Sequence, residues 1–294
     1  MGDGLPLRSP RDYRWCVTEG PPGEAVTGAA GRWRDELARW AVPDDIRAAA
    51  PASPWRFPPA LFARRAEQAL AGGGDGPSRR RALEALPAGG SVLDVGVGGG
   101  AASLPLVPPA GLVVGVDDAE GMLEAFAAAA GRLGVAHREV AGTWPGVAGR
   151  VEPADVVVCH HVLYNVADLV PFAAALTDRA RHRVVVEISA DHPTAHLNPL
   201  WLALHGLERP TSPTAGDAVA VLEEMGLDVA YEAFERPWEP FGADRAGAVA
   251  MARERLCVGP ERDAEVEVLL ERAAARSPVR RGVTVWWPGT ASGG

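Results

Sequence analysis

The chain has 294 residues, enough to bury one large core or two smaller ones. Apolar residues make up 47% and charged residues 23%, which is ordinary for a soluble globular protein. The net charge of −9 argues against a general nucleic-acid binder, and the absence of lysine excludes Schiff-base chemistry on that side chain.

The composition also bounds the cellular setting. The three cysteines, Cys16, Cys159 and Cys257, lie far apart and form no C-x-x-C pair, so zinc ribbons and disulfide frameworks are not indicated. No apolar run reaches membrane-spanning length, and the first residues lack a signal-peptide pattern. We therefore expect a cytoplasmic protein without a membrane partner.

The N-terminal quarter differs from the rest of the chain. Residues 1–30 are rich in glycine and proline and predict an irregular arm, whereas 31–71 carry helical patterns. A glycine-rich linker follows at 72–77. We therefore expect residues 1–77 to form an arm and a helical cap.

Residues 78–294 alternate between strand and helix patterns. A helix is predicted at about 78–86, and seven apolar runs then predict strands: 92–97, 112–117, 135–140, 154–159, 183–188, 227–234 and 282–287. Two further helices are predicted at 243–256 and 260–275, inside an insertion at about 240–278. The fold class is therefore α/β, with a Rossmann-like, mainly parallel seven-stranded sheet and helices on both faces.

The first of these strands runs into a glycine cluster. Residues 92–97 lead into Gly96, Gly98 and Gly100, with Asp94 two residues before the first glycine. Such a turn lets a ligand approach the backbone closely, where a side chain would block it. By itself the cluster is weak evidence for a binding site.

The second strand strengthens this interpretation because it ends in an acid, Asp117, 23 residues after Asp94. A carboxylate at this place can accept hydrogen bonds from both hydroxyls of a ribose. Dinucleotide-binding dehydrogenases share these features, and Gly96, Gly98 and Ala101 fit their pattern. Those enzymes usually place the turn near the N-terminus and need no acid at position 94.

Residues 92–100 resemble motif I of the class I S-adenosylmethionine (SAM) dependent methyltransferases, and 112–123 resemble their second motif. The likeness is closest to the type 11 and type 12 methyltransferase domains and covers roughly residues 80–235. It implies SAM as the cofactor and a final strand that runs antiparallel to its neighbours. The long insertion before that strand departs from the minimal fold; with the N-terminal helices and residues 191–215, we expect it to build a lid over the substrate.

The resemblance implies a set of cofactor contacts. Gly96, Gly98 and Gly100 would wrap the methionine part of SAM, while Asp94 would steady the turn or bind the SAM ammonium group through water. Asp117 would bind the ribose. The other candidate cofactor-binding residues are Asp118, which also suits a helix cap, Met122, which also suits the core, and Cys159.

The third strand lacks the acid that many family members place near the adenine amino group. The sequence there contains Thr143 and Trp144. Thr143 can contact the adenine through its hydroxyl or backbone, and Trp144 can stack on the ring. Trp144 is equally suited to anchoring the loop against Pro145.

The fourth strand ends at the place that faces the reactive methyl group in this family. His160, His161 and Tyr164 are therefore the candidate catalytic residues, with either histidine a possible general base. The alternative is that one histidine caps the next helix or packs below the cofactor.

Two other groups of polar residues are considered as binding sites. Asp191, His192, His196 and His205 offer metal ligands, but their spacing matches no zinc motif, so we expect no metal. Arg56, Arg64 and Arg65 are candidates to hold the SAM carboxylate.

The function predicted from the sequence is therefore SAM-dependent methylation of a small-molecule acceptor, with O- or N-methylation undecided. No nucleic-acid partner is expected, and the protein would be a monomer or homodimer. A SAM-binding regulator without methyl transfer and an NAD(P)-dependent oxidoreductase remain as alternatives.

Overall fold

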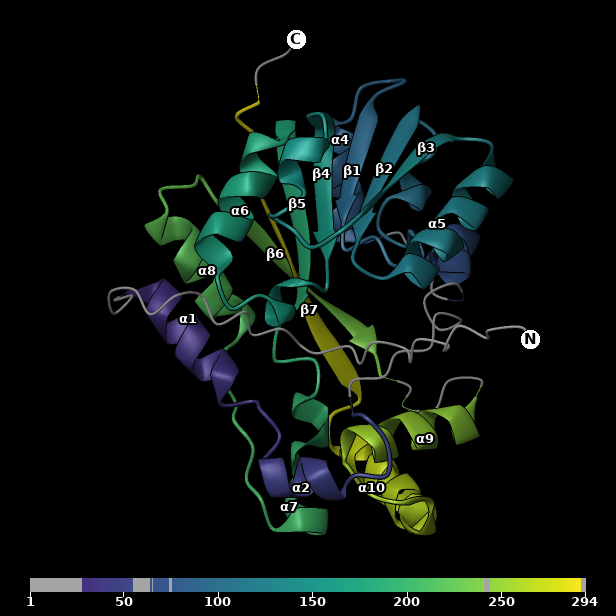
Figure 1. The fold of residues 1–294 in the computed structure, drawn as a ribbon, viewed down its shortest axis with the longest axis vertical. Coiled ribbons are helices and arrows are strands. Elements are labelled where there is room, and N and C mark those ends of the chain that lie inside the picture. The colour runs from purple at the N-terminus through teal and green to yellow at the C-terminus, as the bar shows by residue number, and fades with distance from the viewer. Residues whose placement is uncertain are drawn as a thin grey trace, which may run out of the picture.

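The computed structural model describes residues 28–54, 64, 66–73, 76–238, 240 and 244–291. Its seven strands form one sheet (Figure 1). They are β1 (Ser91–Val95), β2 (Leu112–Asp117), β3 (Ala136–Ala141), β4 (Ala154–His160), β5 (Ala180–Ser189), β6 (Ala230–Pro237) and β7 (Val279–Pro288).

The sheet has the order β3-β2-β1-β4-β5-β7-β6, and β7 is antiparallel to both of its neighbours. The predicted fold class is confirmed, and all seven predicted strands are present. The sixth begins at Ala230 instead of 227, because Leu227 and Val229 pack their side chains on the core from the loop before the strand.

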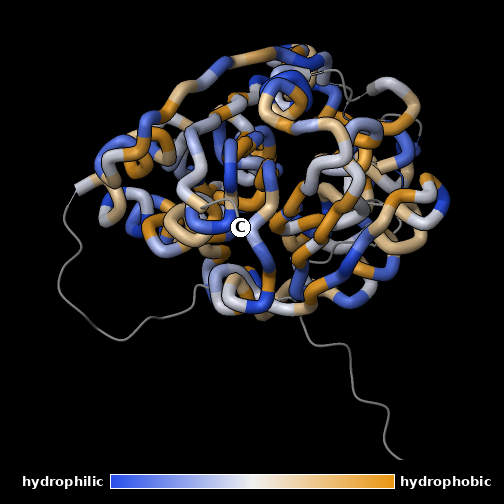
Figure 2. The backbone as a smooth tube through the Cα atoms, turned by 90° about the horizontal axis from the view of Figure 1, so that it is seen from above, coloured by the Kyte–Doolittle hydropathy of each residue, from blue (hydrophilic) through white to orange (hydrophobic). Residues whose placement is uncertain are grey.

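Helices cover both faces of the sheet (Figure 1). On one face, α4 (Pro77–Ala85) and α5 (Glu120–Leu133) cover a core that includes Val92, Val158 and Phe126. On the other face lie α6 (Leu169–Asp178) and α8 (Ala215–Glu224), with α1 (Ala29–Ala38) packed outside α8. Hydrophilic and hydrophobic segments alternate along the peripheral coils in Figure 2, as expected for helices that bury one side.

A helical cap lies beyond the carboxyl ends of the parallel strands, and β7 reaches it (Figure 1). It contains α2 (Asp44–Ala49), α7 (Asn198–His205), α9 (Arg245–Arg255) and α10 (Asp263–Arg276). Leu200, Leu256 and Leu270 are buried together with Val42 in a separate hydrophobic core. The N-terminal segment, residues 191–215 and the insertion therefore do meet in one cap.

The helix α1 departs from this expectation, because it belongs to the sheet layers and not to the cap. Trp33 is fully buried, donates its Nε1–H to the carbonyl of Val166 at 2.8 Å, and stacks on Tyr164. Trp33 thus secures α1 to the sheet.

Short helical turns complete the described fold. They are η1 (Ala69–Gly73), η2 (Leu104–Leu106), η3 (Ala148–Arg150), η4 (Leu163–Asn165), η5 (Ala195–Leu197) and η6 (Pro260–Arg262). The segment after β1 contains only η2, as its prolines predict. No helix in the described part of the chain is long and apolar enough to cross a membrane.

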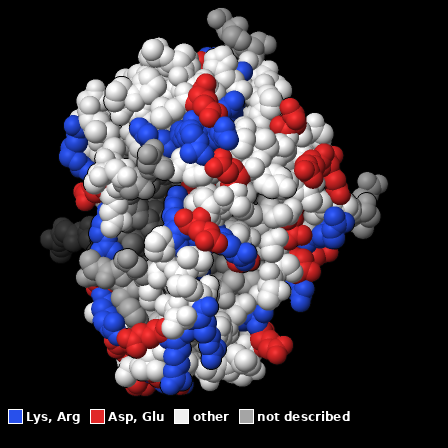
Figure 3. All heavy atoms as spheres, turned by 180° about the vertical axis from the view of Figure 1, so that it is seen from behind, with Lys and Arg blue, Asp and Glu red and all other residues white. Residues whose placement is uncertain are grey.

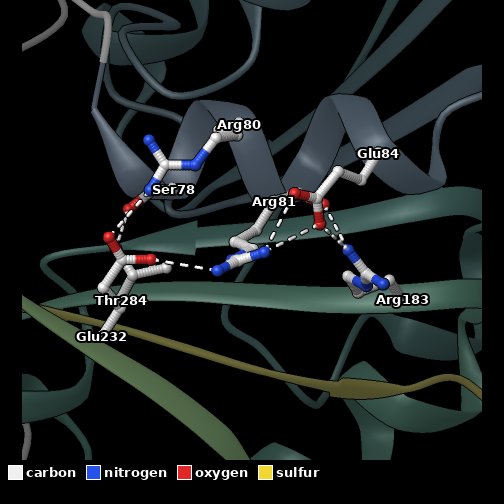
Figure 4. Close-up of polar contacts among 7 residues, drawn as sticks. All are labelled: Ser78, Arg80, Arg81, Glu84, Arg183, Glu232 and Thr284. Atoms are coloured by element: carbon white, nitrogen blue, oxygen red, sulfur yellow. Dashed lines mark hydrogen bonds and ion pairs between the residues drawn. The ribbon is translucent and has the colours of Figure 1, made fainter.

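A charged network holds α4 on the sheet (Figure 4). Arg81 lies between Glu84 and Glu232, at 2.9 and 3.1 Å, and its guanidinium also sits over the ring of Trp286. Arg183 of β5 contacts Glu84 at 2.9 Å. Acidic and basic side chains therefore alternate on this side of the molecule, as the view from behind shows (Figure 3).

Candidate functional site

The glycine turn after β1 is tied to β2. The amides of Gly96 and Val97 both donate to the carbonyl of Val116, at 2.9 and 3.0 Å. Gly96, Gly98 and Gly100 have φ values of 76°, 50° and 85°, in the left-handed region that favours glycine. A Cβ on Gly96 would lie 2.4 Å from Cγ2 of Val162, so packing also demands glycine there.

Asp117 at the end of β2 faces this turn. Its Oδ2 accepts a hydrogen bond from the Gly98 amide and its Oδ1 accepts one from the Ala119 amide, both at 3.0 Å. Burial raises the pKa of this carboxyl, while the two amide bonds act in the opposite direction. Each oxygen retains acceptor capacity, so the group fits the role of binding ribose hydroxyls.

Asp94 supports the turn from below. Its side chain is 1% exposed and accepts a hydrogen bond from the Ser103 hydroxyl at 2.6 Å. Burial raises the pKa of Asp94 to about 7, against the effect of the Ser103 bond. The Ser103 bond is consistent with the steadying role, while Oδ1 of Asp94 is buried without a hydrogen-bond partner among the described residues.

The two histidines at the end of β4 have different surroundings. Nε2 of His160 is buried and has no hydrogen-bond partner in the described structure. Burial lowers the pKa of His160 to about 4. The His161 ring is half exposed and places Nε2 3.2 Å from Oε1 of Glu187. His161 also has a φ of 60°, an uncommon conformation for a residue other than glycine.

Glu187, on β5, is the anchor of this group. Its Oε2 accepts from the Ser78 hydroxyl at 2.6 Å, and its Oε1 lies 3.1 Å from Arg236 of β6. Burial alone would raise the pKa of Glu187, but the His161 hydrogen bond and the nearby cationic groups hold it well below its usual range. The carboxylate is therefore fixed and charged beside His161.

A family comparison agrees with this geometry. Residues 93–182 match the family model described as a methyltransferase domain. Within the chain, residues 93–182 therefore resemble a methyltransferase domain. This assignment supports SAM as the cofactor predicted from the sequence.

Solved structures share the fold of this chain. The YcgJ protein from Bacillus subtilis has a TM-score of 0.50 at 16% identity, covering 74% of this chain and 99% of that one. A cyclopropane-fatty-acyl-phospholipid synthase-like protein from Lactobacillus casei has a TM-score of 0.50 at 19% identity, covering 87% and 98%. No curated protein is significantly similar to the sequence.

The structure shows the surroundings of three other predicted cofactor contacts. Asp118 is exposed and does not cap α5, because the helix begins after Ala119 and the Asp117 carboxylate takes the Ala119 amide. Cys159 is fully buried in the sheet core and offers no surface to a ligand. Met122 is also buried, at 6% exposed, which matches its alternative role as a core residue.

The structure of the loop after β3 favours loop anchoring over adenine stacking as the role of Trp144. The indole is 7% exposed, packs in the core with Val140 and Val147, and donates its Nε1–H to the carbonyl of Phe172 at 3.3 Å. Trp144 therefore anchors the loop. Thr143 is exposed beside it and stays a candidate for the adenine contact.

Tyr164, a predicted catalytic residue, lies in the hydrophobic core beside the sheet. Its side chain is 2% exposed and its hydroxyl donates to the carbonyl of Ser189 at 3.0 Å. Burial raises the pKa of the phenol further above its usual value, so the hydroxyl stays protonated at neutral pH and cannot accept the acceptor's proton. Tyr164 instead connects the β4 loop to the end of β5.

Each of the histidines considered as metal ligands contacts a different partner. His192 stacks on Trp40 with ring centroids 3.8 Å apart, and Nδ1 of His196 contacts the carbonyl of Pro193. Nε2 of His205 contacts the carbonyl of Leu256 at 2.7 Å.

Some candidates cannot be placed in the site. Arg56 and Arg65 lie outside the described residues, and Arg64 is an exposed helical residue. The residues that sequence reasoning missed are Glu187, Ser78 and Arg236. The one available signal was an acid near the end of the apolar run 184–188.

Proposed function

We propose that this protein transfers the methyl group of SAM to a small-molecule acceptor. The observation that carries the proposal is the hydrogen bond from Gly98 to Asp117, because it joins the two motifs into one site. The glycine turn would hold the methionine part of the cofactor and Asp117 its ribose. SAM supplies an electrophilic methyl group when bound.

In this proposal His161 is the general base. Glu187 accepts from Nε2 of the ring, which leaves Nδ1 to take a proton from an acceptor hydroxyl or amine. The bonds of Glu187 to Ser78 and Arg236 hold the carboxylate still, and therefore orient the imidazole. His160 is a weaker base at pH 7, because burial lowers its pKa to about 4.

The proposal of a small-molecule acceptor rests on the helical cap and on the net charge of the chain. The cap lies beyond the carboxyl ends of the parallel strands and has its own hydrophobic core, as suits a covered, water-poor site. A net charge of −9 disfavours a nucleic-acid acceptor.

The first experiment is calorimetric titration of the purified protein with SAM, S-adenosylhomocysteine and NADPH. Micromolar binding of both adenosyl ligands, without NADPH binding, supports the proposal and justifies an acceptor screen by production of S-adenosylhomocysteine. NADPH binding without adenosyl binding overturns it. Adenosyl binding with no turnover across a broad screen would favour a SAM-binding regulator.

A further inference from the structure

Two arginines stand opposite each other beside the proposed base. Arg236 of β6 and Arg280 of β7 are direct cross-strand partners, on the sheet face that also carries Glu187 and Thr284. Like charges in this arrangement repel each other. Arg236 is paired with Glu187 at 3.1 Å, so within this pair Arg280 is the one without an ion-pair partner among the described residues.

Arg280 makes no hydrogen bond or ion pair with any residue that the structure describes. Its guanidinium lies over the ring of Trp238, with Cζ 4.3 Å from the centroid. The acid whose charge acts on it, Asp191, is bound by Arg281 at 3.3 Å. Burial lowers the pKa of Arg280 to about 10, and the charge of Asp191 acts in the opposite direction.

Two aromatic rings, those of Trp238 and His196, lie beside this cation. The Trp238 amide donates to the carbonyl of Pro278 at 2.7 Å, and this bond fixes the residue at the end of β6. The His196 ring stands edge-on to Trp238 with centroids 5.5 Å apart. Burial, followed by the charge of Arg280, lowers the pKa of His196 to about 3, so it is uncharged at pH 7.

The cation and the proposed base belong to one connected group. His161 contacts Glu187, Glu187 contacts Arg236, and Arg236 pairs across the strands with Arg280. A ligand bound to Arg280 would therefore lie on the sheet face that also carries Glu187, the partner of His161. A partly buried guanidinium beside an aromatic ring is a suitable receptor for a carboxylate.

We propose that Arg280 binds a carboxylate of the methyl acceptor, with Trp238 beside the acceptor's apolar part. The inference rests on the proposed methyltransferase function and narrows its substrate class to small organic acids. One guanidinium without an ion-pair partner among the described residues matches the single charge of a carboxylate better than a phosphate dianion. The carboxylate is the recognition group, and the methylated atom is a separate hydroxyl or amine.

The test uses the full chain saturated with S-adenosylhomocysteine. Benzoate, phenylacetate and indole-3-acetate are titrated calorimetrically, each beside its primary amide, and phenyl phosphate is added as a dianion. The variant is Arg280→Gln. The matched control is Arg276→Gln, which removes the same charge from the exposed end of α10.

We expect at least one acid to bind the wild type and the control alike, and to bind Arg280→Gln roughly 10-fold to 100-fold more weakly. The matched amide should bind weakly to all three proteins. Equal binding of acid and amide, an unchanged affinity in Arg280→Gln, or no binding of any acid overturns the inference. Tighter binding of phenyl phosphate overturns the carboxylate assignment.

Failure of this inference can be told apart from failure of the proposed function. Binding of S-adenosylhomocysteine is measured first in each protein. If the wild type does not bind it, the proposed function fails. If all three bind it equally and the acids show no dependence on Arg280, only the carboxylate site is lost.

Discussion

The amide of Gly98 donates to Oδ2 of Asp117 across 3.0 Å, although 19 residues separate them in the chain. The bond fixes the glycine turn against the end of β2. The same carboxylate takes the Ala119 amide through Oδ1, and so also holds the start of α5. A change at Asp117 therefore acts on the turn and on the proposed ribose contact together.

Asp117→Asn is expected to weaken S-adenosylhomocysteine binding by roughly 10-fold to 100-fold. An amide keeps the shape of the side chain but replaces one acceptor oxygen with a donor, so an amide hydrogen meets either a backbone N–H or a ribose hydroxyl. Calorimetry measures the affinity. Asp118→Asn is the control, because that side chain is exposed, and it should bind like the wild type.

Gly98→Arg is expected to abolish cofactor binding while the protein stays folded. A long side chain at the centre of the turn would occupy the place of the ligand, and the far-ultraviolet circular dichroism should keep its native shape. Because Gly98 is buried, Gly98→Ala serves as a milder second variant. If either folded variant binds SAM with native affinity, the assignment of the turn is wrong.

The elements that could be predicted from sequence are those with local signals. The apolar runs gave the seven strands, and the acid at position 117 marked the end of β2 before any contact was known. Glycines at alternate positions indicated the turn, because glycine is the residue that most readily adopts a left-handed backbone conformation.

The rest of the site depends on distant pairings. His161 meets Glu187 only because β4 and β5 are neighbouring strands with a fixed register. Arg236 contacts Glu187 from β6, which is separated from β5 by β7 in the strand order. Trp144 and Tyr164 had sequence positions suited to a site, but their rings were needed to fill the core. Strand order and burial decide such cases, and neither is visible in local spacing.

Glu187→Gln is expected to lower the free energy of unfolding at pH 7 by about 1–3 kcal/mol, because it leaves Arg236 and Ser78 with a weaker partner. The folded pKa of Glu187 lies below the unfolded value of 4.5. Its stabilisation is therefore complete above about pH 4.5 and is lost as the pH falls through the folded pKa. Urea unfolding at pH 7 and pH 4 should show a difference between variant and wild type that shrinks in acid; a constant difference would contradict the ionised state.

His161→Asn tests the base. Asparagine tolerates the left-handed backbone of this position, so the loop should keep its shape while the imidazole is removed. With an acceptor found by the screen, kcat is expected to fall by roughly 100-fold or more, and the affinity for S-adenosylhomocysteine should stay within about twofold. His160→Asn is the comparison; a larger loss there would move the role of base to His160.

His192→Phe is expected to make the protein less sensitive to acid. His192 is buried against Trp40, and burial lowers its pKa from 6.5 to about 3. Between these values the unfolded chain binds a proton that the folded protein does not, so stability falls as the pH drops below 6.5, by about 2 kcal/mol at pH 5 for this residue alone. Phenylalanine keeps the stacked ring without the titration.

Urea unfolding at pH 7.5 and pH 5 should therefore show a smaller loss of stability in His192→Phe than in the wild type. His182→Gln, which changes a half-exposed ring, should keep the wild-type loss. Equal losses in His192→Phe and the wild type would mean that the folded protein admits the charge, and that the cap opens around His192 in acid.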